Sequence, residues 1–379
     1  MKVLHVGKFY PPENGGIESV TYECVEGLKT LGHDVDVICA TDSPSLAGDS
    51  GVPGALIYRC RSFGTFLRSS MSPRYVAQLR RLCRNYDVIS VHLPNPLPML
   101  SVLGVRDLPP LILHWHADVS TYGLAYRAYS LLERSLLKRC HSVVVATDAH
   151  FETSPVLSDF RDKIVTIPYG ISVTGLHAGA FSRNELIESL SGRKIIFSLG
   201  RFVPYKGFDK LIRAAASLPD EYVVVIGGNG PLWGECQQLI DKLGLNDKVK
   251  LPGRISDQEL GAYYNACHVF CLPSVTTAEA FGVVMIEAMS FGKPVVATRL
   301  GNGVEWVAGD GYTGLTVPVG DCAALAEALR ALVDDQERYG CYSKNAINRF
   351  GSEFTGTVMA ERLTSLYQSA IDGASVLPG

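Results

Sequence analysis

Two carboxylates stand eight residues apart in the stretch AEAFGVVMIEAMSFGKPVVAT, which spans residues 278–298. The apolar run between Glu279 and Glu287 predicts a helix over 281–289, and the Gly-Lys-Pro after it ends the helix before a strand. Because a carboxylate accepts hydrogen bonds from paired hydroxyls, Glu279 could bind a sugar and Glu287 a ribose. The alternative is a partly buried helix with two capping or solvated carboxylates.

The start of that helix is a candidate anion site, because the free amides of a helix N-terminus favour phosphate oxygens. The residues concerned are Phe281, Gly282 and Val283. Two cations, Arg201 and Lys206 in SLGRFVPYKG, come just past an expected strand at 194–200. Cations at the carboxyl end of a strand suit a diphosphate, and two solvated surface charges are the alternative. The next strand leads into the glycine-rich turn IGGNGPL, which contains Gly228.

The first half of the chain carries two further candidates. Gly15 and Gly16, in GGIES, follow the first strand and open a helix, where paired glycines let backbone amides approach an anion. A tight strand–helix turn is the alternative, and the spacing is not GxGxxG, which disfavours a dinucleotide cofactor. His116, in HWHAD, ends a strand at the edge where such sheets bind ligands. A lone histidine is more often structural, so its position at this edge is what favours a functional role.

Length and composition limit the class of protein. At 379 residues the chain exceeds one ordinary core, so two domains are expected. A net charge of −3 argues against a nucleic-acid-binding protein. Ten scattered cysteines without a CxxC suit a reducing cytoplasm and give no metal site. The start MKVLHVGKFYPP lacks a long apolar core, so we expect a strand there and no signal peptide, and no stretch approaches 18 apolar residues.

Short apolar runs alternate with helical patterns along the whole chain. Continuous apolar runs, as opposed to strict alternation, are typical of parallel strands covered on both faces. The expected strands are 2–7, 34–41, 55–60, 87–93, 110–116, 142–148, 163–168, 194–200, 222–228, 248–253, 268–274, 294–298 and 314–319. Thirteen strands are too many for one ordinary sheet, and a break at 170–192 separates two series. The fold class is therefore α/β, with two Rossmann-like, doubly wound domains facing each other across a cleft that should hold the ligand.

An ordered set of motifs resembles the retaining GT-B glycosyltransferases of family 4, and in particular the bacterial polysaccharide and O-antigen mannosyltransferases. The set covers nearly the whole chain and consists of FYPPENGGIES, HWHAD, TIPYGI, GRFVPYKGFDKLI, GGNGPL, LPGRISDQEL, EAFGVVMIEAMSFGKPVVAT and GYTGLTVPVGD. The two glutamates with the GKPV that follows form its most specific part. Tyr169 and Ser172 depart from the family pattern, which often has Asn and Asp there, and Glu305 is the one acidic residue near the usual GG-x-x-E place.

The resemblance implies domain boundaries and site roles. It implies an N-terminal acceptor-binding domain over 1–172, joined by a last helix at about 352–372, and a C-terminal donor-binding domain over 173–351. It assigns the donor sugar to Glu279, the ribose to Glu287, the diphosphate to Arg201 and Lys206, and a place beside the donor sugar to His116. The expected catalytic residues are thus His116, Glu279, Arg201 and Lys206, and the expected donor-binding residues are Gly15, Gly16, Arg201, Lys206, Gly228, Glu279, Phe281, Gly282, Val283 and Glu287.

We expect neither a metal ion nor another cofactor, because no DxD metal motif accompanies these groups. Arg201, Lys206 and the helix amides would then neutralise the leaving diphosphate. Retention of anomeric configuration is implied by the family resemblance. A double displacement would need a carboxylate nucleophile about 5–5.5 Å from a partner acid, and the sequence offers no clear candidate. We therefore favour front-face attack, in which the leaving phosphate oxygen takes the acceptor's proton and His116 orients the donor.

A basic segment in the first half bears on the acceptor. Between Arg59 and Tyr86 there is no acidic residue, and the arginines are Arg59, Arg61, Arg68, Arg74, Arg80, Arg81 and Arg84. A helix expected at 124–139 adds Arg127, Arg134, Lys138 and Arg139. A basic face with aromatic residues suits contact with anionic lipid or a polyprenyl diphosphate, and a solvated basic face is the alternative. We expect a cytoplasmic protein with peripheral contact to the inner face of the cell membrane.

The function that the sequence favours is transfer of a hexose from a nucleotide-sugar to a saccharide acceptor, lipid-linked by preference, in cell-surface polysaccharide synthesis. GDP-mannose is the first choice of donor. A UDP-sugar donor (glucose, N-acetylglucosamine or galactose), with a soluble or lipid acceptor, remains an alternative. A nucleotide-sugar epimerase of the same architecture would lack the paired glutamates, and a silent binding protein would lack His116 or Glu279.

Overall fold

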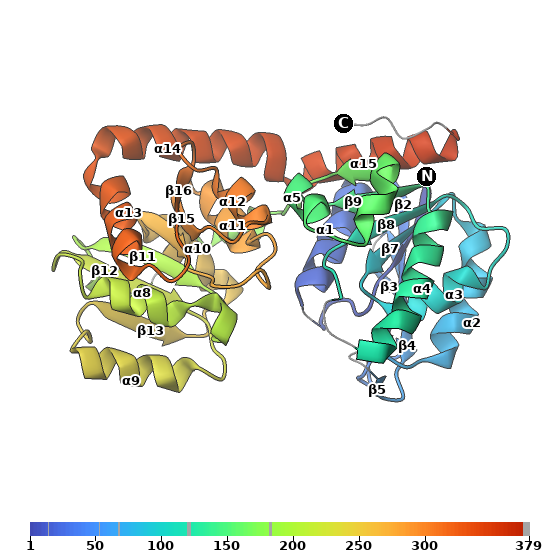
Figure 1. Cartoon of the computed structure of the whole chain (residues 1–379), viewed down its shortest axis with the longest axis horizontal. Helices are drawn as coiled ribbons and strands as arrows, with labels where there is room; N and C mark the ends of the chain where they lie inside the picture. The colour runs from blue at the N-terminus through green and yellow to red at the C-terminus, as the bar shows by residue number, and fades with distance from the viewer. Residues whose placement is uncertain (14, 53, 67–68, 120–122, 182–183, 374–379) are drawn as a thin grey trace. The chain divides into compact units, whose positions relative to one another are not determined.

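A computed structural model describes the chain except for residues 14, 53, 67–68, 120–122, 182–183 and 374–379. It divides into two compact units, which Figure 1 shows in the colours of the chain. The first unit is Met1–Ile171 together with Thr355–Gly379, and the second is Ser172–Phe354. The boundaries expected from the sequence lie within a few residues of these. Among the described residues, no helix has the length and apolar content needed to cross a membrane.

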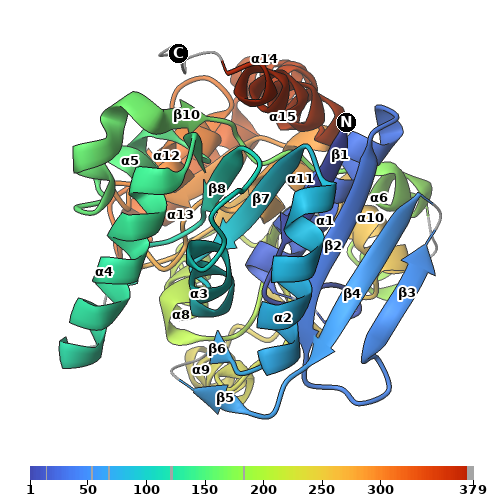
Figure 2. The same cartoon turned by 90° about the vertical axis from the view of Figure 1, so that its right-hand side faces the viewer.

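The first unit is built on an eight-stranded sheet in the order β10-β9-β8-β7-β1-β2-β4-β3 (Figure 2). All its strand pairs are parallel except β3 with β4. Its strands are β1 (Lys2–Val6), β2 (Asp34–Thr41), β3 (Gly48–Val52), β4 (Ala55–Arg61), β7 (Val88–Leu93), β8 (Leu111–Trp115), β9 (Ser142–Val145) and β10 (Ile164–Thr166). A separate hairpin joins β5 (Thr65–Phe66) and β6 (Ser69–Ser70).

Helices cover both faces of this sheet, which is why its strands read as continuous apolar runs. They are α1 (Gly16–Thr30), α2 (Pro73–Leu82), α3 (Pro96–Leu103), α4 (Gly123–Arg139), α5 (Asp148–Glu152) and α15 (Gly356–Ile371), with 3-10 turns at Cys83–Asn85 and Leu157–Lys163. Successive strand residues point to opposite faces, so Leu4 packs with α2, α3 and α4, whereas Val3 packs with α1 and α15. The C-terminal helix α15 thus completes the first unit.

The second unit has a six-stranded parallel sheet in the order β13-β12-β11-β14-β15-β16 (Figure 1). Its strands are β11 (Lys194–Leu199), β12 (Tyr222–Gly227), β13 (Val249–Gly253), β14 (Val269–Leu272), β15 (Val295–Thr298) and β16 (Gly314–Val317). Its helices are α6 (Thr174–Ala178), α7 (Glu185–Ser189), α8 (Phe208–Ala215), α9 (Trp233–Leu243), α10 (Asp257–Ala266), α11 (Val283–Ser290), α12 (Gly303–Ala308), α13 (Cys322–Asp334) and α14 (Gln336–Arg349), with short turns at Pro204–Lys206 and Phe350–Phe354.

All thirteen expected strands are present, and the two parallel sheets confirm the predicted fold class. Residues of β11 alternate between two cores: Ile196 packs with α8, α9 and α13, whereas Phe197 contacts Tyr264 of α10 on the other face. The carboxyl ends of β11, β12 and β14 lie at one edge of the second sheet, because neighbouring parallel strands run in the same direction. That carboxyl edge positions the residues described next.

Candidate functional site

Lys206 and Glu279 meet at the carboxyl edge of the second sheet. Lys206 ends the turn that follows β11, and Glu279 lies in the loop that follows the neighbouring strand β14. Lys206 Nζ lies 2.5 Å from Glu279 Oε2, and the two side chains are only 10% and 12% exposed. Ser274 Oγ donates a second hydrogen bond, 3.1 Å long, to the same oxygen. The cation and the carboxylate that the sequence assigned to different parts of a ligand therefore form one nearly buried ion pair.

Two glycines let the loops of this edge approach one another. Gly207 has a φ of 64°, and a Cβ there would overlap the carbonyl oxygen of Pro273 at the end of β14. Gly228 has a φ of 121°, and a Cβ there would overlap the carbonyl oxygen of Gly200. Both positions thus require glycine for close backbone contact as well as for a left-handed conformation. The fold by itself explains Gly228, whose predicted role in donor binding stays a prediction.

Arg201 lies beside this edge, with no side-chain partner among the described residues. It follows β11, its side chain is exposed, and it makes no side-chain hydrogen bond or ion pair with any residue that the structure describes. A guanidinium offers five N–H donors in a planar fork that matches the oxygens of a phosphate. Arg201 is therefore available to an anionic ligand, whereas the neighbouring Lys206 already has Glu279 as its counter-ion.

Glu287 lies on α11, whose first turn follows a left-handed Gly282 with a φ of 80° and has no side-chain cap. Its Oε2 accepts a hydrogen bond of 2.5 Å from the hydroxyl of Tyr264 on α10. Burial raises the pKa of the Glu287 carboxyl to about 7, although the hydrogen bond from Tyr264 acts in the opposite direction. Glu287 can therefore exchange a proton near neutral pH while Tyr264 holds it in place.

The side chain of Phe281, a residue that the sequence assigned to the candidate anion site, is buried. The ring is 3% exposed and packs with the rings of Trp306 and Phe354, at centroid distances of 6.5 and 6.2 Å. Arg349 lies over the same two rings. The phenyl ring thus belongs to an aromatic cluster of the second unit, and only the backbone around it, with Gly282 and Val283, is left to serve a ligand.

In the first unit His116 follows β8 at the carboxyl edge of that sheet and is 6% exposed. Both of its ring nitrogens have partners: Nε2 lies 2.9 Å from His92 Nδ1, and Nδ1 lies 2.7 Å from the hydroxyl of Tyr169. Burial lowers its pKa, so the ring is neutral near pH 7. The predicted functional histidine is therefore held in a fixed orientation by the fold.

Three further histidines lie in the same layer as His116 and were not singled out from the sequence. They are His5 on β1, His92 on β7 and His114 on β8. His5 Nδ1 lies 2.9 Å from His92 Nε2, and the rings of His92 and His114 stack at 4.4 Å. A signal was present, because KVLHVG, VISVHLP and LILHWH each carry a histidine near the end of an expected strand.

Gly15 and Gly16 form the start of α1, where no side chain caps the helix. Gly15 is extended, and a Cβ on Gly16 would meet no atom within 4 Å. None of the described residues around position 16 therefore requires glycine there, in contrast to the surroundings of Gly207 and Gly228. A requirement for open space next to the helix N-terminus, as for an anion, is consistent with this geometry.

The basic segment is not the continuous basic face that the sequence suggested. The prediction that Arg59 lies on the surface was wrong, because the residue is only 7% exposed. Its guanidinium donates to the carbonyl of Pro11 and to Ser50 Oγ at 2.6 and 2.7 Å. Its place on the inner face of β4, beside Ile57, explains the burial. Arg68 lies outside the described residues.

Acidic residues from other parts of the chain approach two of the remaining arginines. Arg74 lies 3.7 Å from Asp49, and Arg84 lies 3.5 Å from Asp107. Arg61, Arg80 and Arg81 are exposed.

The second basic helix, α4, is also partly neutralised. Arg134 pairs with Asp159 at 2.8 Å, and Arg139 donates to the carbonyl of Leu103 at the end of α3 and to that of Val105 just beyond it, at 3.3 and 2.5 Å. Lys138 remains exposed, and the side chain of Arg127 is not described. Much of the positive charge on this helix therefore serves the fold.

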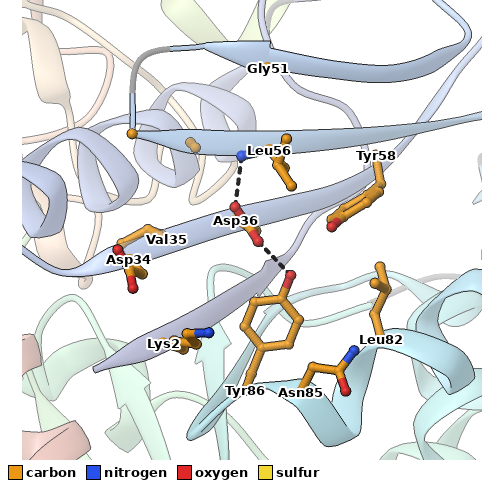
Figure 3. Close-up of a pocket in the computed structure, with 12 residues that line it drawn as sticks. Lys2, Asp34, Val35, Asp36, Gly51, Leu56, Tyr58, Leu82, Asn85 and Tyr86 are labelled. Atoms are coloured by element: carbon orange, nitrogen blue, oxygen red, sulfur yellow. Dashed lines mark hydrogen bonds between the residues drawn. The ribbon is translucent and has the colours of Figure 1, made fainter.

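A hollow at the amino edge of the first sheet is lined by residues that include Lys2, Asp34, Asp36 and Tyr86 (Figure 3). It contains the one feature that contradicts the expected lack of a DxD spacing, because Asp34-Val35-Asp36 has that spacing. The two oxygens of Asp36 accept hydrogen bonds from the Leu56 amide and the Tyr86 hydroxyl, at 2.7 and 2.6 Å. Asp36 therefore braces the sheet, at the edge opposite to the one where doubly wound sheets bind ligands. Within the described part of the chain, no cluster of His, Cys, Asp or Glu could hold a metal ion.

Two family models match the chain: the Glycosyl transferase 4-like domain over residues 15–170 and Glycosyl transferases group 1 over residues 183–349. O-antigen chain mannosyltransferase C of Escherichia coli is 27% identical over 378 residues, which cover 99% of this chain and all of that protein. The D-rhamnosyltransferase WbpZ of Pseudomonas aeruginosa is 30% identical over 358 residues, which cover 94% of this chain and 92% of that protein.

Among solved structures, Anabaena HepE in complex with UDP matches with a TM-score of 0.78 at 20% identity, covering 97% of this chain and 100% of that one. At this identity the likeness shows the fold alone. The two family models, the relatives matched over nearly their full length and the two parallel-sheet units agree with one another. The chain belongs to the GT-B glycosyltransferases of family 4, the family whose motifs its sequence carries.

Proposed function

We propose that this glycosyltransferase moves a mannosyl group from GDP-mannose to a lipid-linked saccharide in the synthesis of a cell-surface polysaccharide, at the inner face of the cell membrane. The observation that carries the proposal is the carboxyl edge of the second sheet, where Lys206 is paired with Glu279 and the exposed Arg201 has no protein counter-ion among the described residues. A nucleoside diphosphate has the negative charge and the acceptor oxygens that can pair with these cationic side chains. The mannosyltransferase and rhamnosyltransferase names of the relatives favour mannose or a sugar of its type.

In this proposal the cationic groups at this edge stabilise the leaving diphosphate, so that no metal ion is needed. When the bond between the sugar C1 and the diphosphate oxygen breaks, negative charge accumulates on the diphosphate. Arg201 can bind two of its oxygens, and Lys206 keeps N–H donors beyond the one that faces Glu279. The first amides of α11 add a partial positive charge. Glu287, held by Tyr264, can accept hydrogen bonds from ribose hydroxyls.

We further propose front-face attack with retention of configuration. The acceptor hydroxyl forms the new C1–O bond on the side that the diphosphate leaves, and its proton passes to the departing phosphate oxygen. This route needs no protein nucleophile. His116, neutral and bonded through both ring nitrogens, has the role of a fixed group that orients the donor sugar and does not itself carry the proton.

The acceptor proposal rests on fewer residues than the sequence suggested. Arg59 is excluded by its burial. The surface that remains comprises Arg61, Arg80 and Arg81, with Arg74 and Arg84 at longer distances from acidic partners that are themselves exposed. Exposed ion pairs of this kind are worth at most about 1 kcal/mol, so they can be exchanged for contacts with anionic lipid or a polyprenyl diphosphate.

Ligand-dependent thermal stabilisation tests the donor assignment. A ligand that binds only the folded state raises the melting temperature as its concentration rises. We expect GDP-mannose to raise it more than UDP-glucose, UDP-N-acetylglucosamine, UDP-galactose or an ADP-sugar does. The Arg201→Ala variant should lose most of the shift, whereas Arg330→Ala, a matched exposed arginine on α13, should keep it. A larger shift with a UDP-sugar would replace GDP-mannose by the alternative donor, and no shift with any of them would refute the proposal.

A further inference from the structure

The first unit contains a layer of four buried histidines, of which only His116 has been given a role so far. His5 lies on β1, His92 on β7 and His114 on β8, and these strands are neighbours in the sheet. Their rings point to the face that α1 and α15 cover, and their exposed fractions are 0%, 1% and 3%. Burying four imidazoles in one layer removes them from water, so their polar atoms must find partners inside the protein.

Three hydrogen bonds join His5, His92 and His116 of this layer to one another and to Tyr169. In order, His5 Nδ1 faces His92 Nε2 at 2.9 Å, His92 Nδ1 faces His116 Nε2 at 2.9 Å, and His116 Nδ1 faces the hydroxyl of Tyr169 at 2.7 Å. Each histidine uses a different nitrogen for each neighbour. At one end of this series, His5 Nε2 is buried and has no hydrogen-bond partner among the residues that the structure describes. Tyr169, at the other end, is half-buried.

The protons of this chain cannot be placed independently. Burial lowers the pKa of His5, His92 and His116, so each ring is neutral and has one donor nitrogen and one acceptor nitrogen. Each hydrogen bond needs one donor and one acceptor, which leaves two arrangements. In the first arrangement every ring donates from Nδ1 toward Tyr169. In the second, the Tyr169 hydroxyl donates to His116 Nδ1, and every ring carries its proton on Nε2, the nitrogen that faces the His5 end.

The two arrangements differ in the protonation of His5 Nε2. If the protons point away from Tyr169, His5 Nε2 carries an N–H group that is buried without an acceptor. If they point toward Tyr169, the same nitrogen keeps only a bare lone pair. Buried donors without a partner are rarer in proteins than buried acceptors without one, and either loss has a desolvation penalty. The burial of His5 Nε2 therefore favours the arrangement in which every ring donates from Nδ1 toward Tyr169.

We propose that His92 and Tyr169 are positioning residues that hold His116 as its Nδ1–H tautomer, with His5 fixing the tautomer of His92. In this arrangement His92 donates to His116 Nε2, and His116 donates to the Tyr169 oxygen. The orientation of the His116 imidazole and the location of its proton are then set by residues from two strands, β1 and β7, and from the segment after β10. The relevance of this tautomer to catalysis rests on the proposed function of His116, whereas the tautomer itself does not.

Selective ¹⁵N labelling of histidine in the full chain tests the tautomer directly, because a protonated and an unprotonated ring nitrogen resonate differently. The variant Tyr169→Phe removes the acceptor of His116, and His92→Leu removes its donor. The variant His92→Asn retains an amide that can reach the place of Nδ1 and should rescue the effect of Leu. Tyr367→Phe is the matched control. Its buried hydroxyl contacts Ser90 and His114, and none of its described hydrogen bonds reaches the three linked histidines.

We expect His116 in the native protein to be a single tautomer with its proton on Nδ1. In Tyr169→Phe and His92→Leu the two tautomers should mix, and kcat should fall about tenfold with little change in the donor KM, as for the loss of one buried hydrogen bond. Tyr367→Phe should keep both the tautomer and kcat. A proton on Nε2 of native His116, or an unchanged tautomer in both Tyr169→Phe and His92→Leu, would overturn the proposal. If no nucleotide-sugar is a donor, the proposed function fails, and the NMR result still decides this one.

Discussion

The ammonium nitrogen of Lys206 and the Oε2 atom of Glu279 lie 2.5 Å apart, with 10% and 12% of the two side chains exposed. The two residues come from loops after neighbouring strands, so the pair ties these loops together at the edge where we propose that the donor binds. A buried ion pair is costly to break from one side, because the remaining charge stays in a poorly hydrated place. We therefore expect Lys206 to serve both catalysis and stability, and Arg201 to serve catalysis alone.

Alanine variants of the two cations should separate these effects. Both Arg201→Ala and Lys206→Ala should reduce turnover at saturating donor by about 10²–10³-fold, since each removes a contact to the departing diphosphate worth on the order of 2–4 kcal/mol. Only Lys206→Ala should also destabilise the fold, by roughly 3–5 kcal/mol, because it leaves Glu279 unpaired. Steady-state rates and melting curves measure the two quantities. Near-native turnover in Arg201→Ala, or native stability in Lys206→Ala, would contradict this account.

The pH dependence of nucleotide binding should report on Glu287. Its pKa is raised to about 7 in the unliganded protein, and ribose hydroxyls donate best to the ionised form. Binding then favours loss of the proton, so the affinity for GDP should fall as the pH drops from 8 through 7 to 6. Calorimetry at several pH values measures it. In Glu287→Gln the affinity should be weaker but independent of pH over this range, and a native profile in that variant would assign the titration to another group.

The same carboxyl should affect stability with a definite sign. Its folded-state pKa lies above the ordinary value of 4.5, so the folded protein binds the proton more tightly than the unfolded chain does. Its contribution to stability is therefore greatest below pH 4.5 and is lost as the pH rises through about 7. Glu287→Gln should consequently gain stability relative to the native protein between pH 5 and pH 8, by about 1–3 kcal/mol. Denaturant unfolding of both proteins at the two pH values would detect the change, and an equal difference at both would count against the raised pKa.

Activity should survive chelation. The positive charge of Arg201, Lys206 and the α11 amides is expected to take the place of a divalent cation at the diphosphate. Initial rates after dialysis against EDTA should equal those of untreated protein, and added magnesium or manganese should change them little. Loss of activity that either ion restores would show that a metal takes part in the reaction.

The exposed arginines of the first unit should bind anionic membranes. Each basic residue near such a surface contributes about 1 kcal/mol, screened over roughly 8 Å at physiological salt. Reversal of Arg80, Arg81 and Arg84 to glutamate should weaken co-sedimentation with anionic vesicles by about one to two orders of magnitude, and salt should weaken the native protein's binding.

A matched control for this triple variant is the reversal of Lys242, Arg330 and Lys344, three exposed cations of the second unit. It gives the same change in net charge and should leave vesicle binding nearly native. The arginine variant should keep its affinity for the nucleotide-sugar and lose more activity on a polyprenyl-linked acceptor than on a short water-soluble one. Equal vesicle binding by the native protein and the arginine variant would make these arginines ordinary solvated surface.

The sequence was most informative about the parallel strands. Strands covered on both faces leave continuous apolar runs, such as VVVI in β12, and all thirteen of those expected are present. The antiparallel edge strand β3, GDSGV, was missed, because glycine and aspartate are poor strand formers and its pairing with β4 depends on tertiary context. The edge that carries Lys206 and Glu279 could be predicted, since both follow buried strands.

Contacts between distant residues could not be predicted in the same way. Arg59 looked like one of a run of surface cations, but its acceptor is the carbonyl of Pro11, 48 residues away. Asp49 and Asp107 lie near Arg74 and Arg84 in space, although the segment around these arginines has no acidic residue. A charge pattern along the chain therefore describes a surface only after the fold has placed its neighbours. The histidine layer was visible only as three separate strand ends.

Transfer to a defined acceptor tests the central claim most directly. The purified chain is incubated with labelled GDP-mannose or labelled UDP-sugars and a polyprenyl-diphosphate-linked saccharide, and the lipid product is analysed for mass and anomeric configuration. The account predicts one added hexose from GDP-mannose, with the α-configuration of the donor retained, and about 10²–10³-fold less product from Arg201→Ala. A product of inverted configuration, or none from GDP-mannose where a UDP-sugar gives one, would contradict it.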